Sequence, residues 1–275
     1  MDCKTDNQTF NAGNSRACRP LLVHGTQSWR EIFDGANLPG AAAVDDFQLN
    51  ETEEILFGLA VAVEQRDSHT AGHCERLAWT AVAIGVAMGL ARSSLLALYR
   101  GGYLHDVGKV GIPDSILFKP GKLTADEWTV MRSHSARGEE ICRPMKSLAP
   151  VLPIIRHHHE RWDGSGYPDG LRGHQIPLLA RVLQIADIYD ALTSARPYKP
   201  AFSGPQALQM MEQETERGWR DPDLFQLFQR LHKDVISRIE GPQGGIEASL
   251  SNLLQMVATA ATTTGNSRTI DPRIS

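Results

Sequence analysis

The sequence predicts an all-α fold, a bundle of several helices. Apolar residues recur every three or four positions in most segments between about residues 50 and 240, and no convincing two-residue alternation typical of strands occurs. Histidines and aspartates recur at intervals of roughly one helix and one loop. Because a bundle can bring side chains together from several helices, this pattern predicts a polar site in the core.

The first predicted helix begins at the segment ETEEILFGLAVAVEQRD. The acidic residues in its first turn suit the positive end of a helix dipole. Helical spacing predicts that it has one buried apolar face, made of Ile55, Leu56, Leu59, Ala60 and Val63.

Three further helices are expected next. In HCERLAWTAVAIGVAMGL, His73 lies on the same helical stripe as Leu77, so its side chain is expected to point inward. SSLLALYRGGYLHDVGK is expected to form a helix that ends near a glycine-containing loop. LTADEWTVMRSHSARGEEIC contains a capping box, Thr124 with Glu127, followed by a helix that carries His134.

The remainder of the domain is also expected to be helical. Its segments are PVLPIIRHHHE, PLLARVLQIADIYDALTS, GPQALQMMEQETE and DPDLFQLFQRLHKDVISRIE, most with a proline suited to the first turn. We expect one domain over residues 46–240. An extension over residues 1–45, with a short helix near 29–33, precedes it. A mostly disordered tail over 241–275, with one amphipathic turn near 250–257, follows it.

Composition excludes several classes of protein. The formal charge of −4 gives no basic field that would attract a nucleic-acid polymer, and no apolar stretch is long enough for a signal peptide or a membrane span. The four cysteines lack the spacing of a disulfide framework or a zinc ribbon. These observations predict a cytoplasmic protein.

Candidate metal ligands recur on the successive predicted helices. They are His73, His105, Asp106, His134, His158, His159 and Asp187. Each one alone is as well explained by a buried side chain with an ordinary hydrogen bond. Together they would leave many unpaired polar groups in one core, at a cost of about 1–3 kcal/mol each, unless a common partner binds them. Imidazole mixed with carboxylate suits Fe or Mn.

The number of candidate ligands exceeds what one ion needs, so the sequence predicts two divalent cations with Asp106 as the bridge. Two such ions can activate a water molecule and neutralise charge on a phosphodiester, which predicts hydrolysis of a phosphate ester. Lys109 follows Asp106 by three residues and is expected to reach an oxygen of the bound phosphate. The alternative for Lys109 is an ordinary surface charge.

HDVGK, HHERWDGSGYP and IADIYDALTSARPYK, in this order and spacing, resemble the HD-GYP branch of the HD phosphohydrolase superfamily. The resemblance covers about residues 50–240 and implies an HD-type helical bundle with a metal centre in its core. It further implies a phosphodiesterase that hydrolyses the bacterial second messenger cyclic di-GMP to linear pGpG, and in some members onward to GMP. Such an enzyme would lower second-messenger signalling.

The resemblance also implies roles for single residues. The seven candidate ligands occupy the metal-binding positions of the family, and Lys109 corresponds to its phosphate-binding lysine. Asp106 and Lys109 are the candidate catalytic residues. The implied substrate contacts are Lys109, Tyr167, Arg196 and Lys199.

Residues beside the motifs lead to three further expectations, about a third ion, His157 and the loop before Tyr167. Some family members bind a third ion through a glutamate at the position of His69 here, so two ions are expected and His69 is the candidate ligand for a third. His157 lies outside the matched pair and is expected beside the site or on the surface. Gly164 and Gly166 predict a tight loop before Tyr167.

Two other functions stay open from the sequence alone. The chain could be a weakly catalytic cyclic-dinucleotide sensor or docking module, or a hydrolase of another cyclic dinucleotide. A diguanylate cyclase that docks on the Gly-Tyr-Pro loop and a second copy of the chain are the candidate protein partners.

Overall fold

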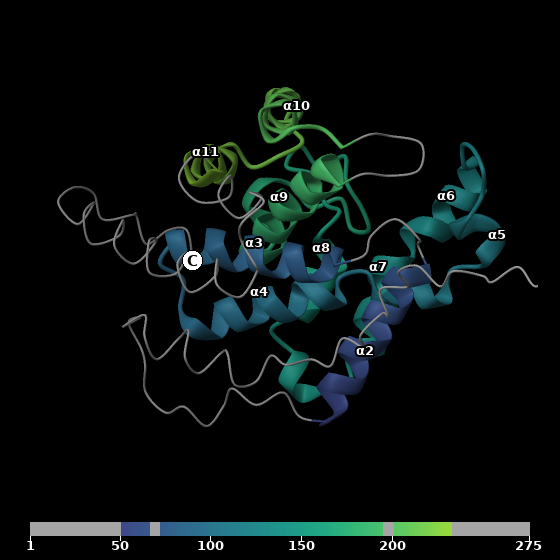
Figure 1. Ribbon diagram of the computed structural model, residues 1–275. Coiled ribbons are helices and arrows are strands. Elements are labelled where there is room, and N and C mark those ends of the chain that lie inside the picture. The colour runs from purple at the N-terminus through teal and green to yellow at the C-terminus, as the bar shows by residue number, and fades with distance from the viewer. Residues whose placement is uncertain (1–50, 67–71, 195–200, 233–275) are drawn as a thin grey trace, which may run out of the picture.

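The structure, a computed structural model, describes residues 51–66, 72–194 and 201–232. These residues form helices and no strand, which confirms the all-α prediction (Figure 1). In chain order the elements are α2 (Glu51–Arg66), α3 (His73–Ala87), α4 (Arg92–Leu104), η2 (Val107–Gly111), α5 (Asp114–Leu117), α6 (Ala125–Arg132), α7 (His134–Cys142), η3 (Lys146–Leu148), α8 (Leu152–His157), η4 (Gly173–Gln175), α9 (Leu178–Thr193), α10 (Gly204–Glu216) and α11 (Pro222–Leu231).

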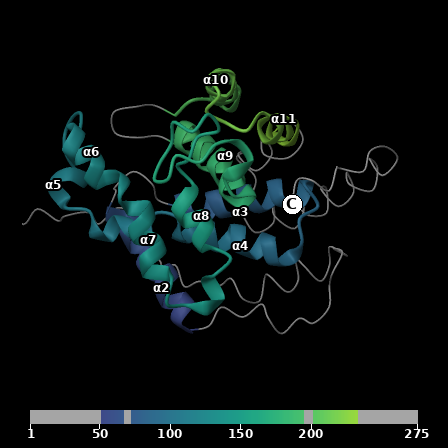
Figure 2. The ribbon, with the colours of Figure 1, turned by 180° about the vertical axis from the view of Figure 1, so that it is seen from behind.

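Helices α3 and α4 lie side by side at the centre of the bundle (Figures 1 and 2). Helix α9 packs against α3, α4 and α8, and it is covered in turn by α10 and α11. Helix α7 packs against η2 and α8, whereas α5 and α6 project from one end of the bundle (Figure 1). The short helix η2 therefore lies against α7 and α2, directly after the end of α4.

Two glycines allow α3 and α4 to approach each other closely. A Cβ atom on Gly102 would lie 2.5 Å from the Cα of Ala78, and one on Gly85 would lie 2.7 Å from the side chain of Leu95. Real Cβ contacts of this length essentially do not occur, so a larger residue at Gly102 would push the backbones of the two helices apart, and one at Gly85 would displace the side chain of Leu95. The close approach fixes the position of the end of α4, which carries His105.

The predicted buried face of α2 is partly wrong. Ile55 is 74% exposed and Leu59 is 43% exposed. The buried face consists of Leu56, Phe57, Ala60 and Val63. The helix is rotated relative to the prediction because the Phe57 ring stacks on Tyr103 of α4, with 4.9 Å between the ring centroids. Burial of this aromatic ring favours the Phe57 side of α2 over the Ile55 side.

The predicted capping box is present at the start of α6. The Thr124 hydroxyl accepts a hydrogen bond from the Glu127 N–H at 3.3 Å, and the Thr124 N–H donates to the Glu127 carboxylate at 2.7 Å. The segment predicted as one helix is divided at Ser133 into α6 and α7, so His134 is the first residue of α7. The division places His134 at a helix end rather than in a helix interior.

Other expectations fall outside the described residues. These are the short helix near 29–33, the turn near 250–257, and the extension and tail that bound the predicted domain. Cys74 and Cys142 are buried and free. None of the described helices combines the length and apolar character that crossing a bilayer would need.

Candidate metal centre

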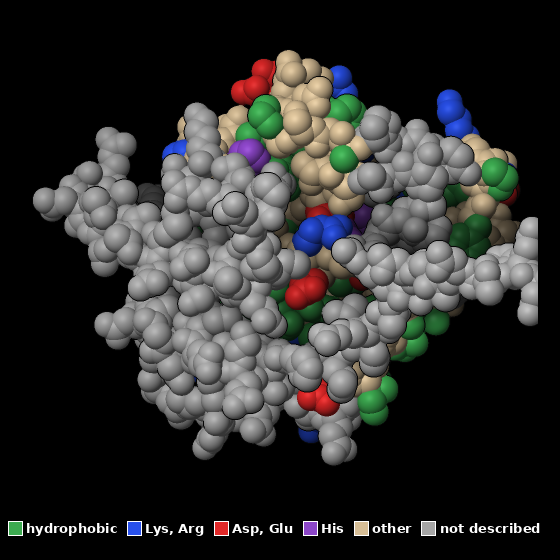
Figure 3. Space-filling model, viewed as in Figure 1, with side chains coloured by type: hydrophobic (Ala, Val, Ile, Leu, Met, Phe, Trp, Pro, Cys, Tyr) green, Lys and Arg blue, Asp and Glu red, His purple; other side chains and the backbone are tan. Residues whose placement is uncertain are grey.

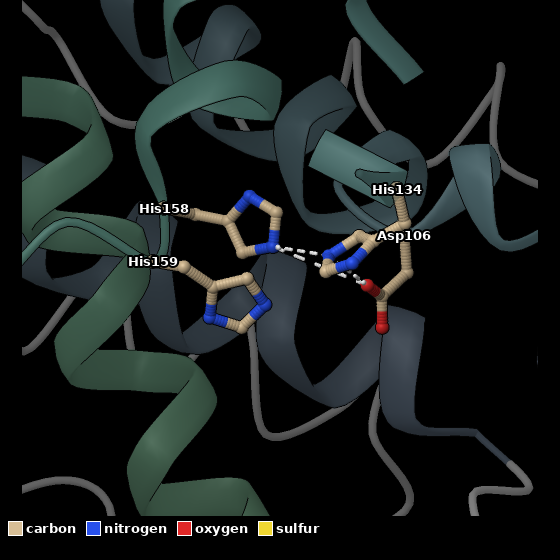
Figure 4. Close-up of side chains that lie close together, drawn as sticks. All are labelled: Asp106, His134, His158 and His159. Atoms are coloured by element: carbon tan, nitrogen blue, oxygen red, sulfur yellow. Dashed lines mark hydrogen bonds and ion pairs between the residues drawn. The ribbon is translucent and has the colours of Figure 1, made fainter. Parts of the chain in front are cut away.

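The structure brings the seven predicted ligands together as two neighbouring groups. One group contains Asp106, His134, His158 and His159, and the other contains His73, His105 and Asp187. Within each group, the possible ligand atoms lie within 4.8 Å of one another. In Figure 4, the rings of His158 and His159 approach from one side, and His134 and Asp106 face them from the other.

Three of the histidines are held in the same way. Each Nδ1 lies within hydrogen-bonding distance of the carbonyl oxygen three residues earlier: His105 of Gly102 at 3.0 Å, His134 of Met131 at 2.8 Å and His158 of Ile155 at 2.8 Å. A carbonyl can only accept, so each Nδ1 carries the proton in this arrangement. The lone pair of each Nε2 is therefore available to a cation.

His73 is held by a carboxylate instead. Its Nδ1 lies 2.6 Å from Oδ2 of Asp190, and its Nε2 lies 3.5 Å from Oδ1 of Asp187. Burial alone would raise the pKa of Asp190, but hydrogen bonds from His73 and Arg76 lower that pKa to about 2. Asp190 is therefore ionised at neutral pH and favours the His73 tautomer that directs Nε2 toward the second group.

Asp106 lies between the two groups. Its Oδ1 lies 3.2 Å from His134 Nε2 and 3.9 Å from His158 Nε2. Its Oδ2 lies 3.3 Å from His105 Nε2 and 2.6 Å from the ammonium nitrogen of Lys109. One carboxylate thus turns one oxygen toward each group, which is the arrangement that a bridging ligand requires.

Residues of η2 reach this position because Gly108 has no side chain. A Cβ atom at Gly108 would lie 1.9 Å from the carbonyl oxygen of His134 and 2.5 Å from the N atom of Gly138. The backbone of η2 can therefore pack directly on α7. This contact sets the distance between Asp106 and His134.

The electrostatics of the centre suit a cation. Burial lowers the pKa values of His134, His158 and His159, so these imidazoles are neutral ligands. Burial alone would raise the pKa of Asp106, but Lys109 and His105 hold that pKa well below its usual range. Burial alone would lower the pKa of His105, but the Asp106 carboxylate raises it. A positive charge is therefore favoured between these two residues.

Two buried ligand atoms in the centre also lack hydrogen bonds. Within the described part of the chain, neither His105 Nε2 nor Asp106 Oδ1 has a hydrogen-bond partner. Buried polar atoms of this kind cost free energy unless something binds them. A divalent cation held by imidazole and carboxylate would satisfy both, so the residues fit a metal centre.

The loop that follows the three histidines is anchored by Glu160. This side chain is fully buried, and its carboxylate accepts hydrogen bonds from the N–H groups of Asp169 at 2.8 Å and Leu171 at 3.1 Å. Gln184 of α9 donates from its amide nitrogen to the carbonyl oxygens of His158 and Glu160. Glu160 therefore anchors the loop, and Gln184 anchors the backbone of His158 and Glu160 at its start.

The two glycines expected to shape this loop do so. Gly164 has φ of 82°, in the left-handed region that glycine favours. A Cβ atom on Gly166 would lie 2.2 Å from the N atom of Arg161, so the chain can only double back here without a side chain. Tyr167 then lies beside the centre, with its ring centroid 4.8 Å from that of His159.

The remaining candidate residues have different outcomes. Lys109 contacts the centre through Asp106 and is no isolated surface charge. His157 is half-buried and lies apart from the two groups, with its Nδ1 3.6 Å from an oxygen of Asp169. His69, Arg196 and Lys199 lie outside the described residues, so their predicted roles stay predictions.

The residues that support the candidate ligands were not predicted from the sequence. Asp190 stands three residues after Asp187, about one helical turn, so the pair could have been recognised as carboxylates on one face of α9. Glu160 follows the histidine run directly, and an acidic residue at that place was the available signal in the sequence. Nothing in the local sequence distinguishes Gln184 from a surface residue of α9.

Comparison with curated proteins shows close relatives of this region. The chain is 45% identical over 166 residues to the cyclic di-GMP phosphodiesterase response regulator RpfG of Xanthomonas campestris pv. campestris, which covers 58% of this chain and 44% of the relative. It is 42% identical over 182 residues to 3'3'-cGAMP-specific phosphodiesterase 2 of Vibrio cholerae, and the match covers 65% of this chain and 35% of the relative. It is 39% identical over 245 residues to a cyclic di-GMP phosphodiesterase of Vibrio cholerae, and the match covers 84% of this chain and 50% of the relative. The chain spans half or less of the length of these relatives.

Among solved structures, the fold is similar to that of a cyclic GMP-AMP specific phosphodiesterase of V. cholerae, V-cGAP3. The TM-score is 0.54 at 21% sequence identity, over 73% of this chain and 53% of that chain. This likeness shows a shared helical fold.

The matching family model gives the clearest assignment. A model described as an HD domain matches residues 59–224, which is more than half of the chain. The matched span contains all seven candidate ligands of the two groups, from His73 to Asp187. The family predicted from the HDVGK motif and its companions is thereby confirmed, and the chain belongs to the HD domain family.

Proposed function

We propose that this chain is a metal-dependent phosphodiesterase that hydrolyses cyclic di-GMP. The observation that carries the proposal is the position of Asp106, whose two carboxylate oxygens face the two ligand groups separately. A shared carboxylate of this kind suits two divalent cations a few ångströms apart. Relatives at 45% and 39% identity named as cyclic di-GMP phosphodiesterases support the choice of substrate.

The donor set indicates which ions the centre would hold. Asp106, His134, His158 and His159 would bind one cation, and His73, His105, Asp187 and the shared Asp106 would bind the other. Imidazole together with carboxylate favours Fe or Mn over Mg or Ca, which prefer oxygen donors alone. When bound, such ions supply Lewis acidity toward a phosphodiester and toward the water that attacks it.

Residues of the chain itself would orient the substrate. The ammonium group of Lys109 lies at the edge of the centre, where it can donate to a phosphate oxygen while it stays close to Asp106. Tyr167 would contact the ligand from the loop beside His159. Arg196 and Lys199 are proposed as further substrate contacts on the basis of their motif positions alone.

One assay separates the candidate functions. Protein loaded with Fe or Mn is incubated with cyclic di-GMP, 3'3'-cGAMP and cyclic di-AMP, and the products are separated by chromatography. Cleavage of cyclic di-GMP at the highest kcat/KM, to pGpG or GMP, supports the proposal. Preferred cleavage of 3'3'-cGAMP supports the second candidate, which the 42% identical relative favours. Tight binding without turnover would show a sensor and overturn the enzymatic proposal.

Four further expectations stay proposals. They are a cytoplasmic location, a third ion bound through His69, a homodimer, and a diguanylate cyclase docked on the Gly-Tyr-Pro loop. The division of the chain at residues 45 and 240 is likewise a prediction, and the family match over residues 59–224 falls within it.

A further inference from the structure

A stack of aromatic and cationic side chains extends outward from the metal centre. The guanidinium carbon of Arg132 lies 5.3 Å from the ring centroid of Tyr167 and 5.6 Å from that of Trp128. Both distances are within the range of cation–π attraction. Trp128 and Arg132 are four residues apart on α6, so they lie on the same face of that helix.

The stack is continuous with the ligand groups. Tyr167 links them, because its ring lies 4.8 Å from that of His159 and its N–H donates to the His159 carbonyl at 3.3 Å. Trp128 is 45% exposed, and Arg132 is exposed beside it. One planar face and one positive charge are therefore presented to solvent next to the centre.

Arg132 differs from Arg156 and Arg76 in how its charge is balanced. Arg156 pairs with Glu139 and Asp169, and Arg76 pairs with Asp190. Within the described residues, Arg132 has no carboxylate within ion-pair distance, and only aromatic faces hold it. Its charge is thus available to an anionic ligand, in a chain whose formal charge is −4.

We propose that Trp128 and Arg132 form the base-binding end of the substrate site. A nucleobase of the substrate stacks on the exposed indole of Trp128, while the Arg132 guanidinium faces the adjoining phosphate. Stacking of bases on aromatic rings and contact of phosphates with arginine are the usual means of holding a nucleotide without sequence-specific pairing. The inference rests on the proposed function and adds a source of specificity for dinucleotides over small diesters.

The test compares two substrates that share a phosphodiester but differ in having bases. Trp128→Ala, Arg132→Ala and Arg132→Lys are assayed with cyclic di-GMP and with bis(p-nitrophenyl) phosphate. Arg230→Ala on α11 is the control, because Arg230 is exposed and bonds only Gln226 among the described residues. Metal content is measured for each variant, and the Kd for cyclic di-GMP is measured by calorimetry.

We expect the ratio of kcat/KM for cyclic di-GMP to that for bis(p-nitrophenyl) phosphate to fall by about tenfold in Arg132→Ala, mainly through KM. The ratio should fall by a similar factor in Trp128→Ala and by a smaller factor in Arg132→Lys. In Arg230→Ala it should equal that of the parent. An unchanged ratio, or loss of metal from the α6 variants, overturns the inference.

The result also distinguishes this inference from the proposed function. A parent protein that cleaves only bis(p-nitrophenyl) phosphate would contradict the proposed function alone, because the Kd values for cyclic di-GMP would still report on the two α6 residues. A raised Kd in Arg132→Ala and Trp128→Ala would then support the inference. Equal Kd values in all variants, or no binding by the parent, would overturn it.

Discussion

The ammonium nitrogen of Lys109 lies 2.6 Å from Oδ2 of Asp106. The same oxygen lies 3.3 Å from His105 Nε2, so the lysine belongs to the edge of the ligand cluster. Its charge helps to keep Asp106 ionised, since Lys109 lowers the pKa of that carboxyl against the effect of burial. The pair therefore connects the proposed metal bridge to the proposed phosphate contact.

Lys109→Met tests the catalytic role of the ammonium group. Methionine keeps most of the side-chain length but removes the charge, so turnover should fall by about 10²–10³ if the charge stabilises the transition state. The melting temperature and metal content should stay near those of the parent. Lys119→Met is the control, because Lys119 forms an ion pair of the same length with Glu127 away from the centre. Equal turnover in both variants would refute the catalytic role.

Asp106→Ala tests the bridge. We expect about two equivalents of Fe or Mn in the loaded parent. The variant should lose most of this metal and its activity while it keeps its helical circular dichroism, since the helices pack through other residues. Elemental analysis and chromatography of products give the two readings. Asp126→Asn, at an exposed position in α6, should retain both. Full metal occupancy in Asp106→Ala would exclude the bridge.

Asp190→Asn tests the support behind His73. The substitution keeps the shape of the side chain but removes the charge that orients the imidazole through Nδ1. Loss of such a supporting group typically weakens metal binding about 10–100-fold. Competition with a coloured chelator measures this change. An affinity equal to that of the parent would show that Asp190 only packs with Arg76.

Gly108→Ala tests the close contact between η2 and α7. The added Cβ would meet the carbonyl oxygen of His134 at 1.9 Å, so η2 must move and carry Asp106 and Lys109 with it. Metal content and turnover should both fall, together with the melting temperature. Gly58→Ala is the matched control, because a Cβ there meets no atom within 4 Å. In a helix interior this change should stabilise the protein by roughly 0.5–1 kcal/mol.

Glu160→Ala tests the anchor of the Gly-Tyr-Pro loop. Removal of the carboxylate leaves the N–H groups of Asp169 and Leu171 without their acceptor, which should lower the free energy of unfolding by roughly 1–3 kcal/mol. Glu160→Gln keeps one acceptor oxygen, so its free energy of unfolding should fall by less. Urea denaturation measures both, with Glu140→Ala on the exposed side of α7 as the control. A loss no larger than that of Glu140→Ala would contradict the anchoring role.

Local chemistry in the sequence was enough for much of the fold and for the choice of candidate ligands, which the structure brings into two groups. Helical periodicity predicted the helices because the apolar repeat is set by 3.6 residues per turn, and Thr124 with Glu127 predicted a cap whose atoms are only three residues apart. The candidate ligands could be named because their motifs are short and contiguous. Each of these signals lies within one or two turns of the chain.

Only the tertiary structure decided how distant elements meet. Asp190 contacts His73 across 117 positions, and Arg132 meets Tyr167 through the approach of α6 to a loop. The sequence could not choose between the two apolar sides of α2, because the choice depends on the Phe57 contact with Tyr103 in α4. The division of the ligands into two groups that share Asp106 likewise follows from η2 packing on α7. These outcomes depend on packing free energy between separate helices, which leaves no periodic signal in either helix alone.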